Sequence, residues 1–223
     1  MSTTSYCETS SRLLVISDIH GHHEAMLRLL HEARYTPFKD RLYLLGDYID
    51  ADNPGTWYTL NKIRPLVKNG ARALLGNQEL KLIASLRKRR YRSKQLKWKW
   101  LRKLPLYMLD EGLLFVHAGL RPGIPLLEQT GRDLTEIREA FYTQPAEMMM
   151  LTERCHTIIF GHTPTFKMGA KPGHVWYKEH LIAIDTGAKH HYRLTLLDLS
   201  NGLAYSCATL DNYQYGDVTV ATT

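Results

Sequence analysis

The chain has 223 residues, of which 44% are hydrophobic, and a formal net charge of +7. This size is enough to bury one sizeable core, so we expect a single domain over 1–223 with loosely ordered ends at 1–11 and 211–223. The first twelve residues lack the apolar run of a signal peptide, and no later stretch is apolar for long enough to span a bilayer. Three widely spaced cysteines favour a reducing compartment over a disulfide framework, so we expect a cytoplasmic protein with no membrane partner.

Short apolar runs recur along the chain, and each ends at a Gly, Asp, Asn or His. Residues 24–33 carry apolar side chains at helical spacing, so a helix is expected after the first run. Residues 192–199 and 203–209, with Ser-Asn-Gly between them, predict a β-hairpin. The pattern indicates an α/β fold whose site lies at the carboxyl ends of the strands. The predicted strands are 12–17, 41–45, 71–75, 113–116, 157–160 and 181–184.

Six side chains with metal-binding chemistry follow these runs directly. Any one of them could equally be a turn former or a solvated loop residue. Together they offer the oxygen and nitrogen ligands that divalent ions prefer, and two ions about 3.5–4 Å apart can share a carboxylate. Neighbouring glycines let the backbone crowd into one place. The sequence therefore predicts a two-metal site formed by Asp18, His20, Asp47, Asn77, His117 and His162.

The motifs around these residues resemble those of the PPP family of metallophosphatases. They are SDIHG (17–21), GDYID (46–50), GNQE (76–79), HAG (117–119) and FGHTP (160–164), extended by HAGLRPG, DLTEIREAF and IDTGA over about 180 residues. The likeness is strongest to the bacterial and phage branch, which includes small serine/threonine phosphatases and symmetrical dinucleoside tetraphosphatases. It implies a calcineurin-like metallophosphoesterase fold, a mixed β-sandwich flanked by helices.

The resemblance also implies roles for the residues of the site. Asp18 and His20 would bind the first metal, Asp47 would bridge both, and the other three ligands would complete the second. Two divalent ions are implied, with manganese placed before iron, zinc, nickel and cobalt. A hydroxide bridging the two metals would attack phosphorus. The expected partner is a phosphorylated substrate, and nucleic acid is not expected.

Three functions are compatible with the resemblance. The first is a phosphatase of phosphomonoesters, including phosphoserine and phosphothreonine proteins. The second is a hydrolase of dinucleoside polyphosphates. The third is a metal-bound pseudophosphatase that binds a phosphorylated partner without turnover. The complete ligand set favours an enzyme, because a dead protein has no chemical need for both metals.

Two departures from the family pattern bear on catalysis. Gln78 stands where the family has the histidine that, with the aspartate matching Asp50, protonates the leaving oxygen, so acid assistance should be lost. Ala51 stands where the family has a phosphate-gripping arginine. Activity is therefore expected on aryl phosphates or phosphoanhydrides, whose leaving groups need little protonation. Candidate catalytic residues are Asp50, Gln78 and Arg138, and candidate substrate contacts are Arg138, Arg121 and His22.

The segment 87–103 interleaves Lys and Arg with Tyr91, Trp98 and Trp100. Much of the positive charge of the chain lies here. Cations with aromatic residues are typical of a polyphosphate or nucleic-acid surface, but also of a solvated helix whose apolar stripe faces the core. We predict a basic helical insertion over 84–104, with a substrate lid as the alternative.

Overall fold

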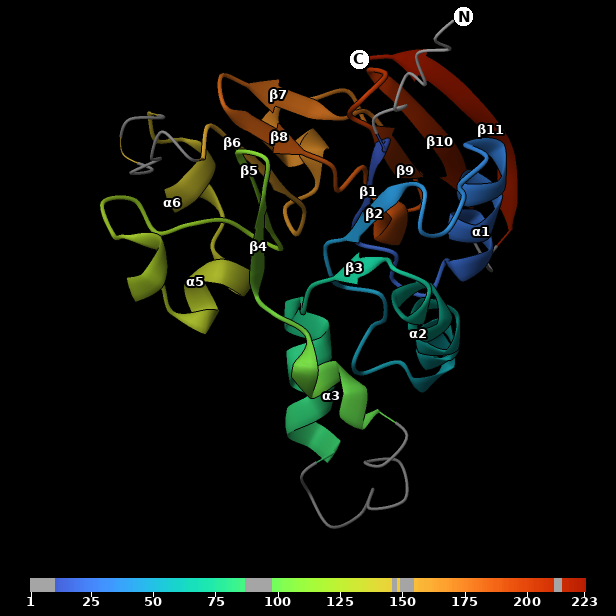
Figure 1. The fold of residues 1–223 in the computed structure, drawn as a ribbon, viewed down its shortest axis with the longest axis horizontal. Helices are drawn as coiled ribbons and strands as arrows, with labels where there is room; N and C mark the ends of the chain where they lie inside the picture. Colours follow the sequence, from blue (N-terminus) through green and yellow to red (C-terminus); the bar gives the residue numbers. More distant parts are fainter. Residues whose placement is uncertain (1–10, 87–97, 146–147, 149–154, 211–213) are drawn as a thin grey trace, which may run out of the picture.

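A computed structural model describes residues 11–86, 98–145, 148, 155–210 and 214–223. The chain forms two β-sheets with helices at their outer sides (Figure 1). The strands are β1 (Leu13–Ile16), β2 (Arg41–Leu44), β3 (Arg72–Ala73), β4 (Tyr107–Asp110), β5 (Leu113–Val116), β6 (Thr157–Phe160), β7 (Trp176–Lys178), β8 (Leu181–Ala183), β9 (Arg193–Asp198), β10 (Leu203–Thr209) and β11 (Tyr215–Thr222).

Helical segments connect many of these strands, and most of them are short. The α-helices are α1 (His23–Glu32), α2 (Leu60–Lys68), α3 (Asn77–Leu86), α5 (Gly131–Glu136) and α6 (Glu139–Tyr142). The 3-10 helices are η1 (Pro54–Thr59), η3 (Lys99–Lys103), η4 (Leu126–Glu128), η6 (Thr165–Met168) and η7 (Ala188–His190). No helix among the described residues is long and apolar enough to cross a membrane.

Both sheets are mixed. The six-stranded sheet has the order β11-β10-β9-β1-β2-β3, in which β1, β2 and β3 are parallel and the other pairs are antiparallel. The five-stranded sheet has the order β4-β5-β6-β8-β7, in which β5, β6 and β8 are parallel. The carboxyl ends of the parallel strands are where the predicted site loops begin.

Alternating side chains of the strands supply three apolar clusters. In β1, Leu13 and Val15 face the other sheet, whereas Leu14 and Ile16 face the helices, as the two-residue period of a strand requires. The inter-sheet cluster also holds Tyr43 stacked on Phe115 at 3.8 Å between ring centroids. The two sheets therefore form a β-sandwich with helices outside, which confirms the predicted fold class.

All six predicted strands are present, and so is the hairpin of β9 and β10. The expectation of a loosely ordered end at 211–223 does not hold for its described part. Residues 215–222 form β11, which pairs with β10 from Leu203 to Thr209. Strands β4 and β7 were not predicted, because their half-exposed residues give no apolar run.

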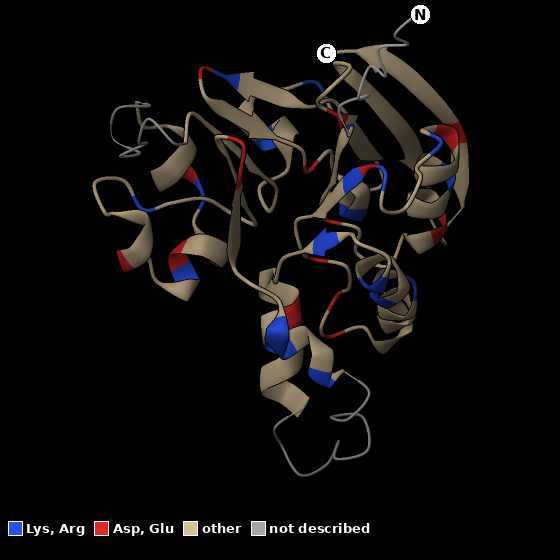
Figure 2. Ribbon diagram, viewed as in Figure 1, with Lys and Arg blue, Asp and Glu red and all other residues tan. Residues whose placement is uncertain are grey.

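The predicted basic insertion is only partly described. Residues 84–86 end α3, and Lys99–Lys103 form η3 rather than an α-helix. Ile83, Leu86 and Leu101 are buried in the core cluster that contains α3, in agreement with an inward apolar stripe. Residues 87–97 carry seven Lys and Arg and no acidic residue, and they lie outside the described residues. Figure 2 shows the Lys and Arg of the described residues spread over helices, strands and loops.

Candidate metal centre

The loops after five strands bring the six predicted ligands to one place between the sheets. Asp18 and His20 follow β1, Asp47 follows β2, and Asn77 begins α3 after β3. His117 follows β5 and His162 follows β6, so the second sheet supplies two ligands. All six residues are at least nine-tenths buried.

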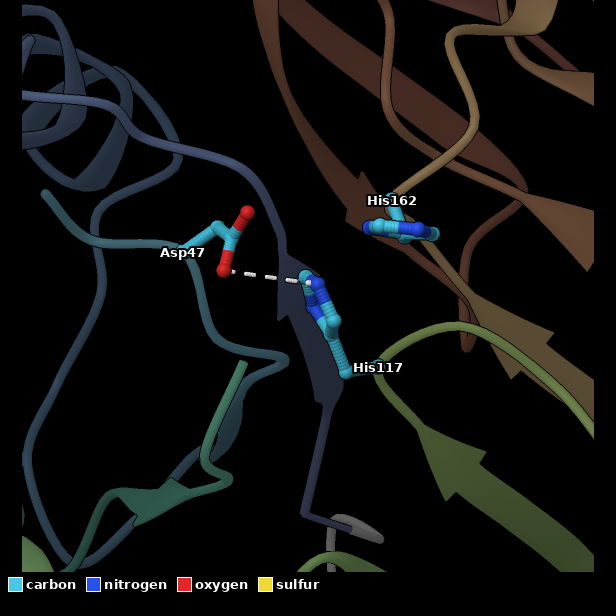
Figure 3. A group of neighbouring side chains, drawn as sticks. All are labelled: Asp47, His117 and His162. Carbon is cyan, nitrogen blue, oxygen red and sulfur yellow. Dashed lines mark ion pairs between the residues drawn. The ribbon is translucent and has the colours of Figure 1, made fainter. Parts of the chain in front are cut away.

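Two groups of side chains have ligand atoms close enough to hold an ion each. The first is Asp18, His20 and Asp47, and the second is Asp47, His117 and His162, with the ligand atoms of each group within 4.8 Å of one another. Figure 3 shows the second group, in which Asp47 and His117 point toward each other at 3.4 Å. Asp47 is common to both groups, which is the position expected of a bridging carboxylate.

The buried polar atoms of the cluster fit a pair of cations. Asp18 Oδ1 and His162 Nε2 have no hydrogen-bond partner in the described structure, which is costly for buried groups. Asn77 Oδ1 lies 3.2 Å from His117 Nε2 and faces only acceptor atoms. Rotating the Asn77 amide by half a turn would convert these acceptor contacts into hydrogen bonds. A cation between the lone pairs would instead satisfy the same atoms in the orientation observed.

Hydrogen bonds fix the tautomers of two of the histidines. His117 Nδ1 lies 2.9 Å from the carbonyl oxygen of Leu45, to which only an N–H can donate. His20 Nδ1 lies 2.9 Å from Asp50 Oδ1. In a neutral ring with Nδ1 protonated, Nε2 presents a lone pair, and in both residues Nε2 faces the cluster. Leu45 and Asp50 thus orient these rings so that Nε2 of each is available to an ion.

The charges of the cluster shift the pKa of its members in opposite directions. Burial lowers the pKa of His20, but the hydrogen bond to Asp50 and the carboxylates of Asp47 and Asp18 outweigh it and raise the value to about 9. Burial, followed by the electrostatic effects of neighbouring His117 and Arg138, lowers the pKa of His162 to about 2. Burial raises the pKa of the Asp18 carboxyl. A cation would lower the cost of ionised carboxylates here and displace the proton from His20.

Glu79 supports the loop that presents Asp47. Its fully buried carboxylate accepts hydrogen bonds from the backbone N–H groups of Asp47 at 2.8 Å, Tyr48 at 2.9 Å and Gly76 at 3.0 Å. Burial and the Asp47 carboxylate raise the pKa of Glu79 to about 8. The sequence motif contained this residue, but its supporting role was not predicted.

The backbone around the ligands is compact and strained. Asp18, His20, Asp47 and His162 all have positive φ, between 45° and 64°, which is uncommon for residues other than glycine. A Cβ at Gly161 would collide with the Asp18 carboxylate, and one at Gly76 would collide with Asp47. These glycines let two loops approach each ligand more closely than any other residue would allow.

Gln78 and Asp50 match the two positions whose residues, by the family resemblance, protonate the leaving oxygen. Gln78 Oε1 accepts a hydrogen bond from the backbone N–H of Ala51 at 3.1 Å. Asp50 Oδ1 accepts from His20 and from Lys189 Nζ, the latter at 2.5 Å. Burial raises the pKa of Asp50, but these two donors outweigh it and lower the value to about 2. Neither side chain carries a proton that it could give to a leaving oxygen at neutral pH.

The three predicted substrate contacts differ in their placement. Arg138 is exposed at the N-cap of α6, and its Nη1 lies 3.4 Å from the carbonyl oxygen of His162, so it borders the cluster. Arg121 makes an ion pair with Asp133 at 2.7 Å, a partner that the sequence did not indicate. His22 is buried at the N-cap of α1, with Tyr215 edge-on at 5.9 Å. Burial and the cationic His20 lower the pKa of His22 to about 4, so it is neutral at pH 7.

The family assignment follows from a comparison with known protein families. The model of the calcineurin-like phosphoesterase family matches residues 11–189, which contain the whole five-stranded sheet, strands β1 to β3 of the other sheet and all six predicted ligands. The chain belongs to this family, a class of metal-dependent hydrolases of phosphoric esters.

Curated relatives of this chain share one name. The chain is 33% identical over 140 residues to a symmetrical bis(5'-nucleosyl)-tetraphosphatase of Shigella dysenteriae, a match that covers 55% of this chain and 49% of the relative. An Escherichia coli O139:H28 protein of the same name is 34% identical over 141 residues, a match that covers 56% of this chain and 49% of that protein. The chain thus spans about half the length of the curated relatives it matches.

Solved structures agree on the fold. A putative diadenosine tetraphosphatase superposes with a TM-score of 0.71 at 21% identity, covering 92% of this chain and 96% of the other. A cold-active protein-tyrosine phosphatase of a Shewanella species superposes with a TM-score of 0.54 at 15% identity, covering 94% and 80%. At these identities the likeness concerns the fold alone.

Proposed function

We propose that the chain is an active two-metal hydrolase of phosphoanhydrides, with dinucleoside tetraphosphates as its substrate class. The observation that carries the proposal is the convergence of six buried ligand side chains, among which Asp18 Oδ1 and His162 Nε2 lack any partner within the described residues. Two bound divalent ions, which we propose to be manganese, would activate a water and neutralise the phosphoryl oxygens.

The side chains around the cluster hold the ligands rather than move protons. Asp50 and the Leu45 carbonyl oxygen keep Nε2 of His20 and His117 directed inward, and Glu79 fixes the Asp47 loop. Arg138 lies beside His162 at that end of the cluster and would bind a phosphoryl oxygen.

The lack of an acid at position 78 favours the anhydride class. An alkoxide leaving from a serine or threonine phosphate needs a proton, whereas a nucleoside diphosphate leaves as a stable anion. Gln78 instead accepts from the Ala51 N–H, and Asp50 is ionised. The names of the curated relatives agree with this preference.

A substrate panel with a metal-free control tests the proposal. Purified protein would be supplied in turn with manganese, iron, zinc, nickel and cobalt and assayed on diadenosine tetraphosphate, p-nitrophenyl phosphate and a phosphoserine peptide. We expect release of ADP from the first and nitrophenol from the second, with the peptide cleaved far more slowly. Asp47→Asn should abolish all turnover, because it removes the shared carboxylate.

Two results would contradict this proposal and favour another function. Phosphopeptide cleavage as fast as ADP release would return the function to a phosphoprotein phosphatase. Stoichiometric binding of two metals with no turnover on any substrate would make the chain a pseudophosphatase that binds a phosphorylated partner.

A further inference from the structure

Lys189 is a cation at the edge of the cluster that no sequence motif singled out. It lies on η7, directly after the loop that follows β8, and its Nζ is 2.5 Å from Asp50 Oδ1. The same oxygen is 2.9 Å from His20 Nδ1. One carboxylate therefore links the ammonium group to the first group of predicted metal ligands.

The backbone that carries Lys189 is firmly held. Asp185 Oδ1 accepts from the N–H of Gly187 at 3.0 Å, and Thr209 Oγ1 donates to the carbonyl oxygen of Ala188 at 3.0 Å. The side chain of Lys189 nevertheless remains 46% exposed. A rigid backbone with an accessible ammonium group is suited to an anionic ligand that arrives from solvent.

An ion pair with Asp50 does not account for this lysine by itself. Pairs this exposed contribute little to stability, because water and salt screen them. The ammonium has three N–H donors, and Asp50 is its only hydrogen-bond partner among the described residues. Two donors are then left for a ligand.

Lys189 and Arg138 border different ends of the cluster. Lys189 is connected through Asp50 to His20, in the first ligand group, whereas Arg138 contacts His162, in the second. A single phosphoryl group between the metals would be served by the cation at one end. A chain of phosphates extends its negative charge beyond the reacting group and gains from a cation at each end.

We propose that Lys189 contacts the phosphate chain of the substrate at the end of the cluster formed by Asp18 and His20. The ligand class is a phosphoanhydride with at least two consecutive phosphates. The inference rests on the proposed function and extends it by naming the residue that recognises the chain.

Binding measurements on the metal-loaded full chain test this role without requiring turnover. The dissociation constants of ADP and of inorganic phosphate would be measured by calorimetry for the wild type, Lys189→Met, Lys189→Arg and Lys171→Met. Lys171 is an exposed lysine ahead of β7, so its replacement matches the change in net charge. We expect Lys189→Met to bind ADP about 10-fold more weakly, the loss of one charge-assisted hydrogen bond. Lys189→Arg should retain most of the affinity, and Lys171→Met should equal the wild type.

Metal content and thermal stability separate substrate contact from a structural role. Lys189→Met should keep both metals and the wild-type Tm, with a raised KM and a nearly unchanged kcat on diadenosine tetraphosphate. Unchanged binding of ADP by Lys189→Met would overturn the inference, as would no ADP binding by the wild type or a loss of metal that accounts for the weaker binding. If the wild type fails to cleave diadenosine tetraphosphate while Lys189→Met still weakens ADP binding, the proposed function fails and the role of Lys189 stands.

Discussion

The pairing of His20 with Asp50 couples metal binding to pH. Because its pKa is raised to about 9, His20 is protonated at neutral pH without metal, and an ion bound at Nε2 must displace that proton. The apparent affinity should therefore rise by about tenfold per pH unit up to about pH 9. Calorimetry in buffers of different ionisation enthalpy should detect release of about one proton per first-site ion at pH 7.5. Without metal, the raised pKa stabilises the fold below the ordinary histidine pKa, and this contribution is lost as pH rises through about 9.

Asp50→Asn tests the carboxylate of this pair separately. An amide oxygen is a weaker acceptor for the His20 N–H, so we expect first-site metal affinity to fall by about tenfold and less proton release. Asp52→Asn, at an exposed position two residues away, is the matched control. Equal metal affinity in the two variants would show that Asp50 does not orient His20.

We predict that position 78 determines which leaving groups the site accepts. Gln78→His would place an ionisable ring near Asp50, so hydrolysis of an alkyl phosphate should rise by about 100-fold, the lower end of acid assistance. Aryl phosphate hydrolysis should change little, because its leaving group needs no proton. Gln78→Ala, which supplies no acid, is the control. A rate on alkyl phosphate no higher than that of Gln78→Ala would contradict this account.

At the scale of elements, Glu79 on α3 holds the loop after β2. Glu79→Gln replaces an acceptor of three backbone N–H groups by an amide with one oxygen and an NH₂ that faces donors. We expect a loss of about 2 kcal/mol in the free energy of unfolding, together with weaker metal binding through Asp47. Urea unfolding of this variant beside Glu32→Gln, on the exposed end of α1, provides the comparison. Equal stability of the two would exclude the supporting role.

The elements that the sequence predicted are those whose own residues determine them. Strands β1, β2, β5 and β6 are buried apolar runs, and a predicted ligand follows each of them. The end of the apolar run and the ligand motif therefore indicate the same strand end. Strand β11 has no continuous apolar run, and its pairing with β10 holds it in the sheet. Edge strands β4 and β7 depend in the same way on their neighbours.

The side chains of the site differ in the same way, since some could be predicted from the sequence and others depend on distant neighbours. The six ligands were predicted from residue type and position, and the structure brings them together, while their binding of metal stays a prediction. The contact of Lys189 with Asp50 joins residues 139 positions apart, and one sequence carries no signal for such a pairing. The position of Lys189 directly after the IDTGA motif was the only indication that it lies near the site.

At the scale of the whole molecule, the cluster joins the two sheets. Asp18 Oδ2 accepts from the N–H of His162 at 2.9 Å, and His117 Nδ1 donates to the Leu45 carbonyl oxygen, so loops of both sheets are connected around the ligands. We propose that the two sheets form one cooperative unit that unfolds in a single transition. Manganese at 100 times its dissociation constant should stabilise the fold by about 2.7 kcal/mol per site, and EDTA should reverse the shift in Tm. Two separate transitions, or a Tm indifferent to EDTA, would contradict this coupling.

The order in which the ligands occur along the chain has a consequence for biosynthesis. Asp18 is synthesised 144 residues before His162. A nascent chain therefore cannot complete the second group of ligands until β6 has emerged. The first group, Asp18, His20 and Asp47, is complete once the loop after β2 has been made, so capture of the second cation would be the later event in maturation.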